Sequence, residues 1–259
     1  MSVTVVGSGA SAVHFALTAL EKGHHVTMLD VGRERPAPVN PQDGFEDLKH
    51  NLEDPVEHFL GKEFQAVVYP GGDGEYYGFP PNKQYIFEGV DPFAVRSTGF
   101  TPLTSFAQGG LAEAWTSGSF PFHAGEITDF PVDFPELNRF YNVVADRIGI
   151  SGARDDLAQY FPVPDSMMPA LKMDESSRLL LDAYGKKRAA LASDGFVMGR
   201  SRVATLSADK DGRPGCDYLG RCLIGCPIES LYTPVVTLRE CMAFPNFEYR
   251  SGLCVSHFR

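Results

Sequence analysis

The hydrophobic pattern of the first thirty residues predicts a strand, a helix and a second strand. Residues 3–6 (VTVV) form a short β-branched run, typical of a buried parallel strand. Small and apolar residues then recur at helical spacing, at Ala12, Ala16, Ala19 and Leu20. Gly23 is expected to end this helix, and residues 26–29 (VTML) have the composition of another buried strand. The pattern therefore indicates an α/β fold.

Two longer helices are predicted further along the chain by the same helical period. The first covers residues 137–148, and the second covers residues 175–193, with Gly195 as its stop. The apolar stripe of the first helix consists of Leu137, Tyr141, Val144 and Ile148. We interpret the apolar faces of both helices as core packing.

The remaining pattern predicts strands at the end of the chain and irregular structure near its beginning. Residues 247–250 and 253–258 alternate like strands. Proline and glycine are dense between residues 36 and 102, so this stretch is predicted to be irregular.

Composition narrows the range of functions. The length of 259 residues fits one large domain or two smaller ones, and 43% hydrophobic with 22% charged residues is ordinary for a globular protein. The net charge of −10 disfavours nucleic-acid binding, which needs clusters of lysine and arginine. No apolar run approaches the roughly 18–20 residues that span a bilayer, and no signal peptide is evident. These observations predict a soluble cytoplasmic protein with no nucleic-acid or membrane partner.

A glycine-rich turn joins the first predicted strand to the first helix. Residues 7–12 (GSGASA) match the G-x-G-x-x-G/A pattern of dinucleotide-binding turns. Gly7 permits the tight turn, Gly9 lets the backbone approach a pyrophosphate, and the small Ala12 allows close packing of helix on strand. The unpaired N–H groups of the helix N-terminus then face the phosphates. Because strand, helix and second strand surround this turn, we interpret it as a nucleotide site.

An acid follows the second strand at the position expected of a ribose acceptor. Asp30 ends that strand, 23 positions after Gly7. Its carboxylate can accept hydrogen bonds from ribose hydroxyls, whereas the extra phosphate of NADP would favour arginine. The turn and the acid leave FAD and NAD both open.

Four further segments resemble one family of flavoenzymes, the glucose–methanol–choline oxidoreductases, with the pyranose oxidase-like branch as the nearest match. Residues 28–32 (MLDVG) are similar to the acid-x-Gly that ends the family's second strand, and residues 108–116 (QGGLAEAWT) to its glycine-pair motif. Residues 129–152 follow a helix that ends in G-I-S-G, with Phe130 where the family has tryptophan. Residues 216–227 (CDYLGRCLIGCP) resemble its cysteine segment.

The resemblance implies a Rossmann-like FAD-binding domain and an incomplete α+β substrate domain. It implies a discontinuous flavin domain at residues 1–35, 96–128 and 246–259, an irregular insertion at 36–95, and the start of the substrate-binding domain at 129–245. The implied FAD contacts are Gly7, Ser8, Gly9, Ala10, Ser11, Asp30, Val31, Gly32, Gly109, Gly110, Trp115, Thr116 and Val255. Ala114 stands where several members bond FAD through histidine, which implies a non-covalent cofactor.

The five cysteines all lie in the last fifth of the chain, and three of them belong to the cysteine segment. Their odd number argues against a disulfide framework. An iron–sulfur cluster needs four thiolates at suitable spacing, and Leu219 stands where the second would be. We therefore predict structural thiols and no metal.

The resemblance also indicates that the chain corresponds to an N-terminal half. On this resemblance, the family's His–His or His–Asn pair would lie in the other half, so no catalytic residue is assigned, and a complementary protein chain or a homo-oligomer is expected. The leading hypothesis is FAD-dependent oxidation of a CH–OH group of a sugar or alcohol, by hydride transfer to flavin N5. The alternatives are a non-catalytic subunit that keeps the fold as a binding or assembly module, and an NAD-dependent dehydrogenase.

Overall fold

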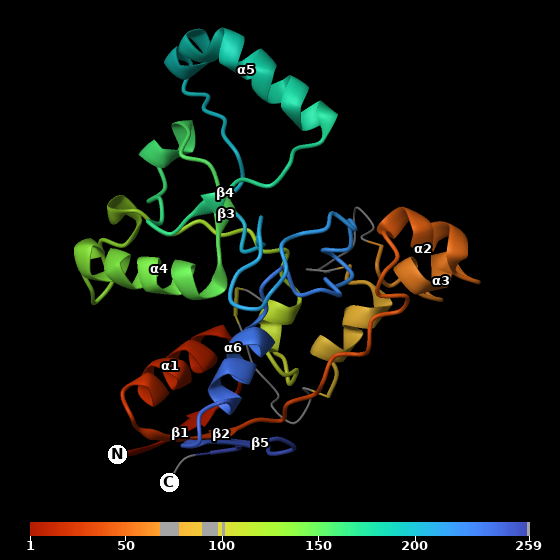
Figure 1. The fold of residues 1–259 in the computed structure, drawn as a ribbon, viewed down its shortest axis with the longest axis vertical. Helices are drawn as coiled ribbons and strands as arrows, with labels where there is room; N and C mark the ends of the chain where they lie inside the picture. Colours follow the sequence, from red (N-terminus) through yellow and green to blue (C-terminus); the bar gives the residue numbers. More distant parts are fainter. Residues whose placement is uncertain (68–77, 90–97, 100–101, 258–259) are drawn as a thin grey trace. The chain divides into compact units, whose positions relative to one another are not determined.

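The computed structural model describes residues 1–67, 78–89, 98–99 and 102–257. It divides the chain into two compact units (Figure 1). Unit 1 consists of Met1–Thr116, Tyr218–Glu229 and Thr233–Arg259, and unit 2 of Ser117–Asp217 and Ser230–Tyr232. Parts of the predicted insertion (68–77, 90–95) and of the predicted flavin domain (96–97, 100–101, 258–259) lie outside the described residues. The flavin and substrate roles assigned to chain segments remain predictions.

Unit 1 is built on a three-stranded parallel sheet with the order β1-β2-β5. The strands are β1 (Ser2–Val6), β2 (His25–Leu29) and β5 (Phe247–Arg250). Val3 pairs with Val26, and Val26 pairs with Phe247, so the end of the chain adds a third strand beside the first two. Parallel neighbours require crossover connections, which here contain α1 (Ala10–Glu21) and α6 (Pro234–Met242). The predicted strand–helix–strand unit is confirmed.

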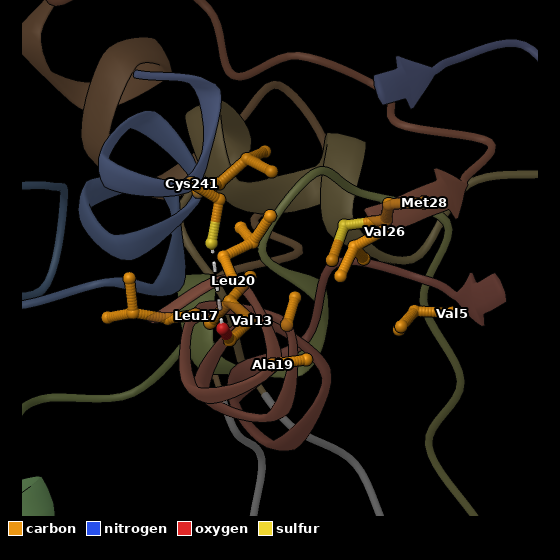
Figure 2. Close-up of a cluster of buried hydrophobic side chains, with 10 residues drawn as sticks. Val5, Val13, Leu17, Ala19, Leu20, Val26, Met28 and Cys241 are labelled. Carbon is orange, nitrogen blue, oxygen red and sulfur yellow. Dashed lines mark hydrogen bonds between the residues drawn. The ribbon is translucent and has the colours of Figure 1, made fainter. Parts of the chain in front are cut away.

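The core of unit 1 lies between the sheet and its two crossover helices. Figure 2 shows strand side chains such as Val26 and Met28 beside residues of α1 and Cys241 of α6. The Cys241 thiol lies 3.7 Å from the carbonyl oxygen of Val13, which joins α6 to α1. As predicted, Gly23 ends α1: its φ is +78°, and the N–H groups of Gly23 and His24 bond the carbonyls of Leu20 and Ala19.

The chain around residues 36–67, predicted to be irregular, contains the short helices α2 (Phe45–Asn51) and α3 (Pro55–Leu60). Asp54 caps α3 by accepting a hydrogen bond from the Glu57 N–H, 2.8 Å from N to Oδ1, and Pro55 occupies the first turn. The 3-10 turns η1 (Pro81–Ile86) and η2 (Gly110–Glu113) also belong to unit 1. The proline and glycine content that predicted irregularity is thus compatible with short capped helices.

Unit 2 contains α4 (Phe134–Ile148), α5 (Glu175–Ser193) and a two-stranded parallel sheet of β3 (Ser151–Gly152) and β4 (Met168–Pro169). It also includes η3 (Ala124–Glu126) and η4 (Asp156–Gln159). Both predicted helices are present, and Gly195, with φ of +78°, follows the end of α5.

Two expectations from the hydrophobic pattern are wrong. The apolar residues of α5 do not form core: only Tyr184 of this helix is buried, and Leu179 and Leu180 are 56% and 58% exposed. The apolar positions of α5 follow a helical period, but a period does not specify which element packs against the helix. The described part of the second C-terminal strand, residues 253–257, is not a strand, because Gly252 turns the chain with a φ of +75°.

None of the helices in the described part of the chain has the length and apolar character needed to cross a lipid bilayer.

Candidate functional site

The turn between β1 and α1 leaves an open cradle of backbone. Gly7 has a φ of +82°, and its N–H donates to the carbonyl of Leu29, 2.8 Å from N to O. A Cβ placed on Gly7 or on Gly9 would meet no atom within 4 Å. The space above these two glycines is therefore not filled by described side chains.

The N-terminus of α1 has donors with no side-chain cap. Gly9 is the N-cap residue, and its extended backbone offers no side chain to the first N–H groups. In contrast, α3, α4 and α5 begin with Asp54, Asp133 and Asp174, each of which accepts a backbone hydrogen bond. Uncapped N–H groups and the helix dipole favour an anion at this end of α1. Ala10 and Ser11, the next two predicted contacts, form the exposed start of the helix.

The second glycine turn lies directly against the first. A Cβ on Gly110 would come within 3.3 Å of the Cα of Gly9, and Gly110 also has a φ of +64°. The N–H of Gly109 donates to the hydroxyl of Ser8, 2.9 Å from N to Oγ. Although about one hundred residues separate these turns in the chain, the structure brings them into contact.

Backbone pairing after β2 explains how the two turns meet. The N–H of Arg33 donates to the carbonyl of Phe106 (2.9 Å from N to O), and the N–H of Gln108 donates to the carbonyl of Arg33 (2.8 Å). Residues 106–108 thus run parallel to the chain that leaves β2. The glycine pair that follows therefore lies at the carboxyl ends of β1 and β2. In open α/β sheets, ligands bind at these ends of the strands.

Asp30 joins the same group of residues through Ser8. The Ser8 hydroxyl donates a short hydrogen bond to Oδ2 of Asp30, and the Tyr249 hydroxyl donates to the same oxygen over 3.0 Å. The Gln108 side chain in turn donates to the Tyr249 hydroxyl, 3.2 Å from Nε2 to Oη. One hydrogen-bonded network therefore links both glycine turns to the acid at the end of β2.

Burial raises the pKa values of both titratable side chains in this network, Asp30 and Tyr249. Asp30 is 7% exposed, and this burial raises the pKa of its carboxyl above the ordinary value, against hydrogen bonds from Ser8 and Tyr249 that lower it. Burial likewise raises the pKa of Tyr249 to about 12. The phenol is therefore a neutral donor at physiological pH.

Tyr249 occupies the space beside Gly32. A Cβ on Gly32, whose φ is +65°, would overlap the Tyr249 hydroxyl. The carbonyl of Val31 accepts from the Gly252 N–H, 3.0 Å from N to O, so the chain leaving β5 passes next to Val31. Val255 follows three residues later and is half-buried. A ribose that reaches Asp30 must compete with the hydroxyl of Tyr249.

The remaining predicted contacts lie just after the glycine pair. Trp115 is half-buried and Thr116 is exposed at the end of the first segment of unit 1. Ala114 packs against a small cluster of Tyr85, Ile86 and Ala107. A methyl group at this position offers no atom for a covalent bond to a cofactor.

A buried ionic group under the glycine pair was missed by sequence reasoning. The Glu113 side chain is 1% exposed, and its Oε2 accepts from the Tyr85 hydroxyl over 3.2 Å. The Lys83 ammonium donates to the Glu113 carbonyl, 2.6 Å from Nζ to O. A Cβ on Gly109 would lie 2.6 Å from Oε1 of Glu113, so this carboxylate also restricts position 109 to glycine. No motif or spacing in the sequence links residues 83, 85 and 113.

Leu219 and Arg221 of the cysteine segment support residues 36–45 within unit 1. Buried Arg221 donates to the carbonyl oxygens of Val39 (2.9 Å), Asn40 (2.7 Å) and Asp43 (3.1 Å). The Phe45 N–H donates to the Leu219 carbonyl, 2.7 Å from N to O. None of the five cysteines forms a disulfide, and the described residues contain no group of three or more His, Cys, Asp or Glu side chains arranged to hold a metal ion.

No protein-family model matches the chain, and no curated protein matches it significantly. The resemblance to the glucose–methanol–choline family therefore remains a prediction that depends on the motifs themselves.

Proposed function

We propose that unit 1 is a Rossmann-like domain that binds FAD non-covalently across the two glycine turns. The contact between Gly9 and Gly110 is the observation that carries this proposal, since a turn with no ligand role would need no second glycine turn against it. The open space at Gly7 and Gly9, the uncapped N-terminus of α1 and the nearby acid fit a dinucleotide.

Three groups of predicted contacts then have a definite role. The N–H groups at the start of α1 hold the diphosphate, as helix N-termini do in dinucleotide sites. Asp30 accepts the ribose hydroxyls when Tyr249 gives up its hydrogen bond. Ser8 acts as a positioning residue, because its hydroxyl bonds both Asp30 and the N–H of Gly109.

FAD supplies a hydride acceptor at N5 when it is bound. We accordingly propose that the chain is part of an oxidoreductase that acts on a CH–OH group of a sugar or alcohol. Such a reaction requires a base that removes the hydroxyl proton, and no described residue is assigned this role. Flavin binding and substrate turnover are therefore separate predictions, and turnover is expected only with a complementary protein chain.

Titration of the purified chain with FAD tests the proposal. We expect saturable quenching of flavin fluorescence and a visible flavin spectrum that remains with the protein after gel filtration. Preference for NAD over FAD would favour the dehydrogenase alternative, and absence of binding to either would contradict the proposal. Flavin binding with no dye reduction, alone or with a complementary chain, would favour the non-catalytic module.

A further inference from the structure

A small pocket in unit 1 lies outside the group of residues proposed to contact the flavin. Three separate segments form its wall, around Arg35, around Asn82 and Lys83, and around Gly225 and Cys226. It encloses about 80 Å³, whereas roughly 10–15 Å³ suffices for one water molecule. This volume suits an ion the size of phosphate or acetate and is far below that of sites for larger ligands, roughly 300–1,000 Å³.

Lys83 brings a buried positive charge to this pocket. Its side chain is largely enclosed, and its ammonium donates a hydrogen bond to the backbone carbonyl of Glu113. The ammonium also faces the Gly225 side of the wall, since a Cβ on Gly225 would lie 3.7 Å from Nζ. Burial lowers the pKa of Lys83, while the carboxylate of Glu113 opposes this shift. A second anion near Nζ would further stabilise the charged form.

Arg35 adds a second cation to the pocket. Its ion-pair partner, Glu229, is shared with a second arginine. Arg35 and Arg239 both form short ion pairs with the carboxylate of Glu229. Among the described residues, Glu229 is the ion-pair partner of both arginines, and no acidic side chain lines the pocket.

Asn82 is held at the wall of the pocket by a short hydrogen bond. Its amide nitrogen donates to the carbonyl of Ile224, so two of the three wall segments are joined to each other.

We propose that this pocket is a binding site for a small oxyanion, a phosphate or a carboxylate, held by Lys83 and Arg35. The ion can be free or can belong to a larger ligand whose remainder stays outside. Cys226 lines the same pocket, so its thiol reports on the local charge.

Alkylation of the full chain with anionic iodoacetate and neutral iodoacetamide tests the proposal, with peptide mass spectrometry to follow each cysteine. Exposed Cys254 is the internal control. We expect the rate ratio of iodoacetate to iodoacetamide to be several-fold higher at Cys226 than at Cys254. Inorganic phosphate or acetate should slow the alkylation of Cys226 by iodoacetate and leave that of Cys254 unchanged. Sodium chloride at equal ionic strength is the control.

Two variants test the assigned cations. Lys83→Met should lower the rate ratio at Cys226 to that at Cys254 and abolish protection by phosphate. Should Lys83→Met fail to fold, Arg35→Gln, at a partly exposed side chain, provides the same test. Equal ratios at the two cysteines in the unmodified chain, or no protection by phosphate or acetate, would overturn the proposal. Protection by FAD alone would also overturn it, since the charge would then belong to the flavin site.

Discussion

At the scale of single residues, we expect the proposed FAD binding to depend on Asp30. Its carboxylate is buried and already accepts hydrogen bonds from Ser8 and Tyr249. Asp30→Asn keeps the shape but removes a charged acceptor, which contributes about 1.5–3 kcal/mol per hydrogen bond. We expect FAD to bind roughly 10- to 150-fold more weakly to this variant by fluorescence titration. Unchanged affinity would exclude Asp30 as a ribose ligand.

The raised pKa of Asp30 predicts a pH dependence of flavin binding. Protonation converts the carboxylate into a poorer ribose acceptor, so affinity should fall as the pH decreases through the raised pKa, above 3.8. The stability of the protein without ligand has the opposite pH dependence, because the Asp30 carboxyl holds its proton more tightly in the folded state than in the unfolded state. The contribution of Asp30 to the free energy of unfolding therefore declines as the pH rises from 3.8 through the folded-state pKa. Titrations across this range should show the loss of affinity in the unmodified chain and not in Asp30→Asn.

Tyr249 is predicted to compete with the ligand. Its hydroxyl donates to Asp30 and overlaps the space beside Gly32. Tyr249→Phe removes one hydrogen bond to the carboxylate that a ribose would have to replace, worth about 1.5–3 kcal/mol. We expect FAD to bind roughly 10- to 150-fold more tightly to this variant. Weaker binding would show instead that the hydroxyl contacts the ligand.

Local sequence patterns predict the candidate residues of the first turn, whereas Gly109 and Gly110 were predicted only through the family resemblance and Tyr249 was not predicted. Gly7, Gly9 and Asp30 were predicted because one short strand–helix–strand segment contains them. Tyr249 reaches Asp30 across 219 positions, and only the register of β5 on β2 brings them together. No local pattern encodes that register.

At the scale of elements, the stability of unit 1 depends on α1 packing against the sheet and α6. Leu20 of α1 is 2% exposed, whereas Leu179 of α5 is 56% exposed. Leu20→Ala should lower the free energy of unfolding by about 2–5 kcal/mol. Leu179→Ala, the same substitution in an exposed helix, should change it by less than about 0.5 kcal/mol. Urea denaturation followed by circular dichroism compares the two, and similar losses would contradict this account of the core.

The helical and strand periods predicted β1, α1, β2, α4, α5 and β5. Each of these segments has apolar residues at a regular helical or strand spacing. They did not predict α2 and α3, whose few apolar residues follow a stretch rich in proline. The periods also failed to distinguish a core helix from an exposed one, as α5 demonstrates. Burial of a helix depends on what packs against it, which a single segment does not specify.

At the scale of the whole molecule, we expect flavin binding to be confined to unit 1. Hydrogen exchange with and without FAD should show new protection in residues 7–13 and 107–111. Exchange in α5 of unit 2 should stay unchanged. Saturating FAD, at about 100 times the Kd, should also stabilise the fold by about 2.7 kcal/mol. Protection centred on unit 2 would place the ligand elsewhere.

The most direct test of the central claim is FAD titration of Gly9→Ala beside Gly185→Ala. Neither added Cβ would meet an atom within 4 Å, and neither glycine has a positive φ, so both variants should fold. Only the Cβ at position 9 would enter the proposed phosphate cradle. The account predicts that Gly185→Ala binds FAD like the unmodified chain and that Gly9→Ala binds it at least about tenfold more weakly, a loss of roughly 1.4 kcal/mol. Equal affinity in both variants would contradict it.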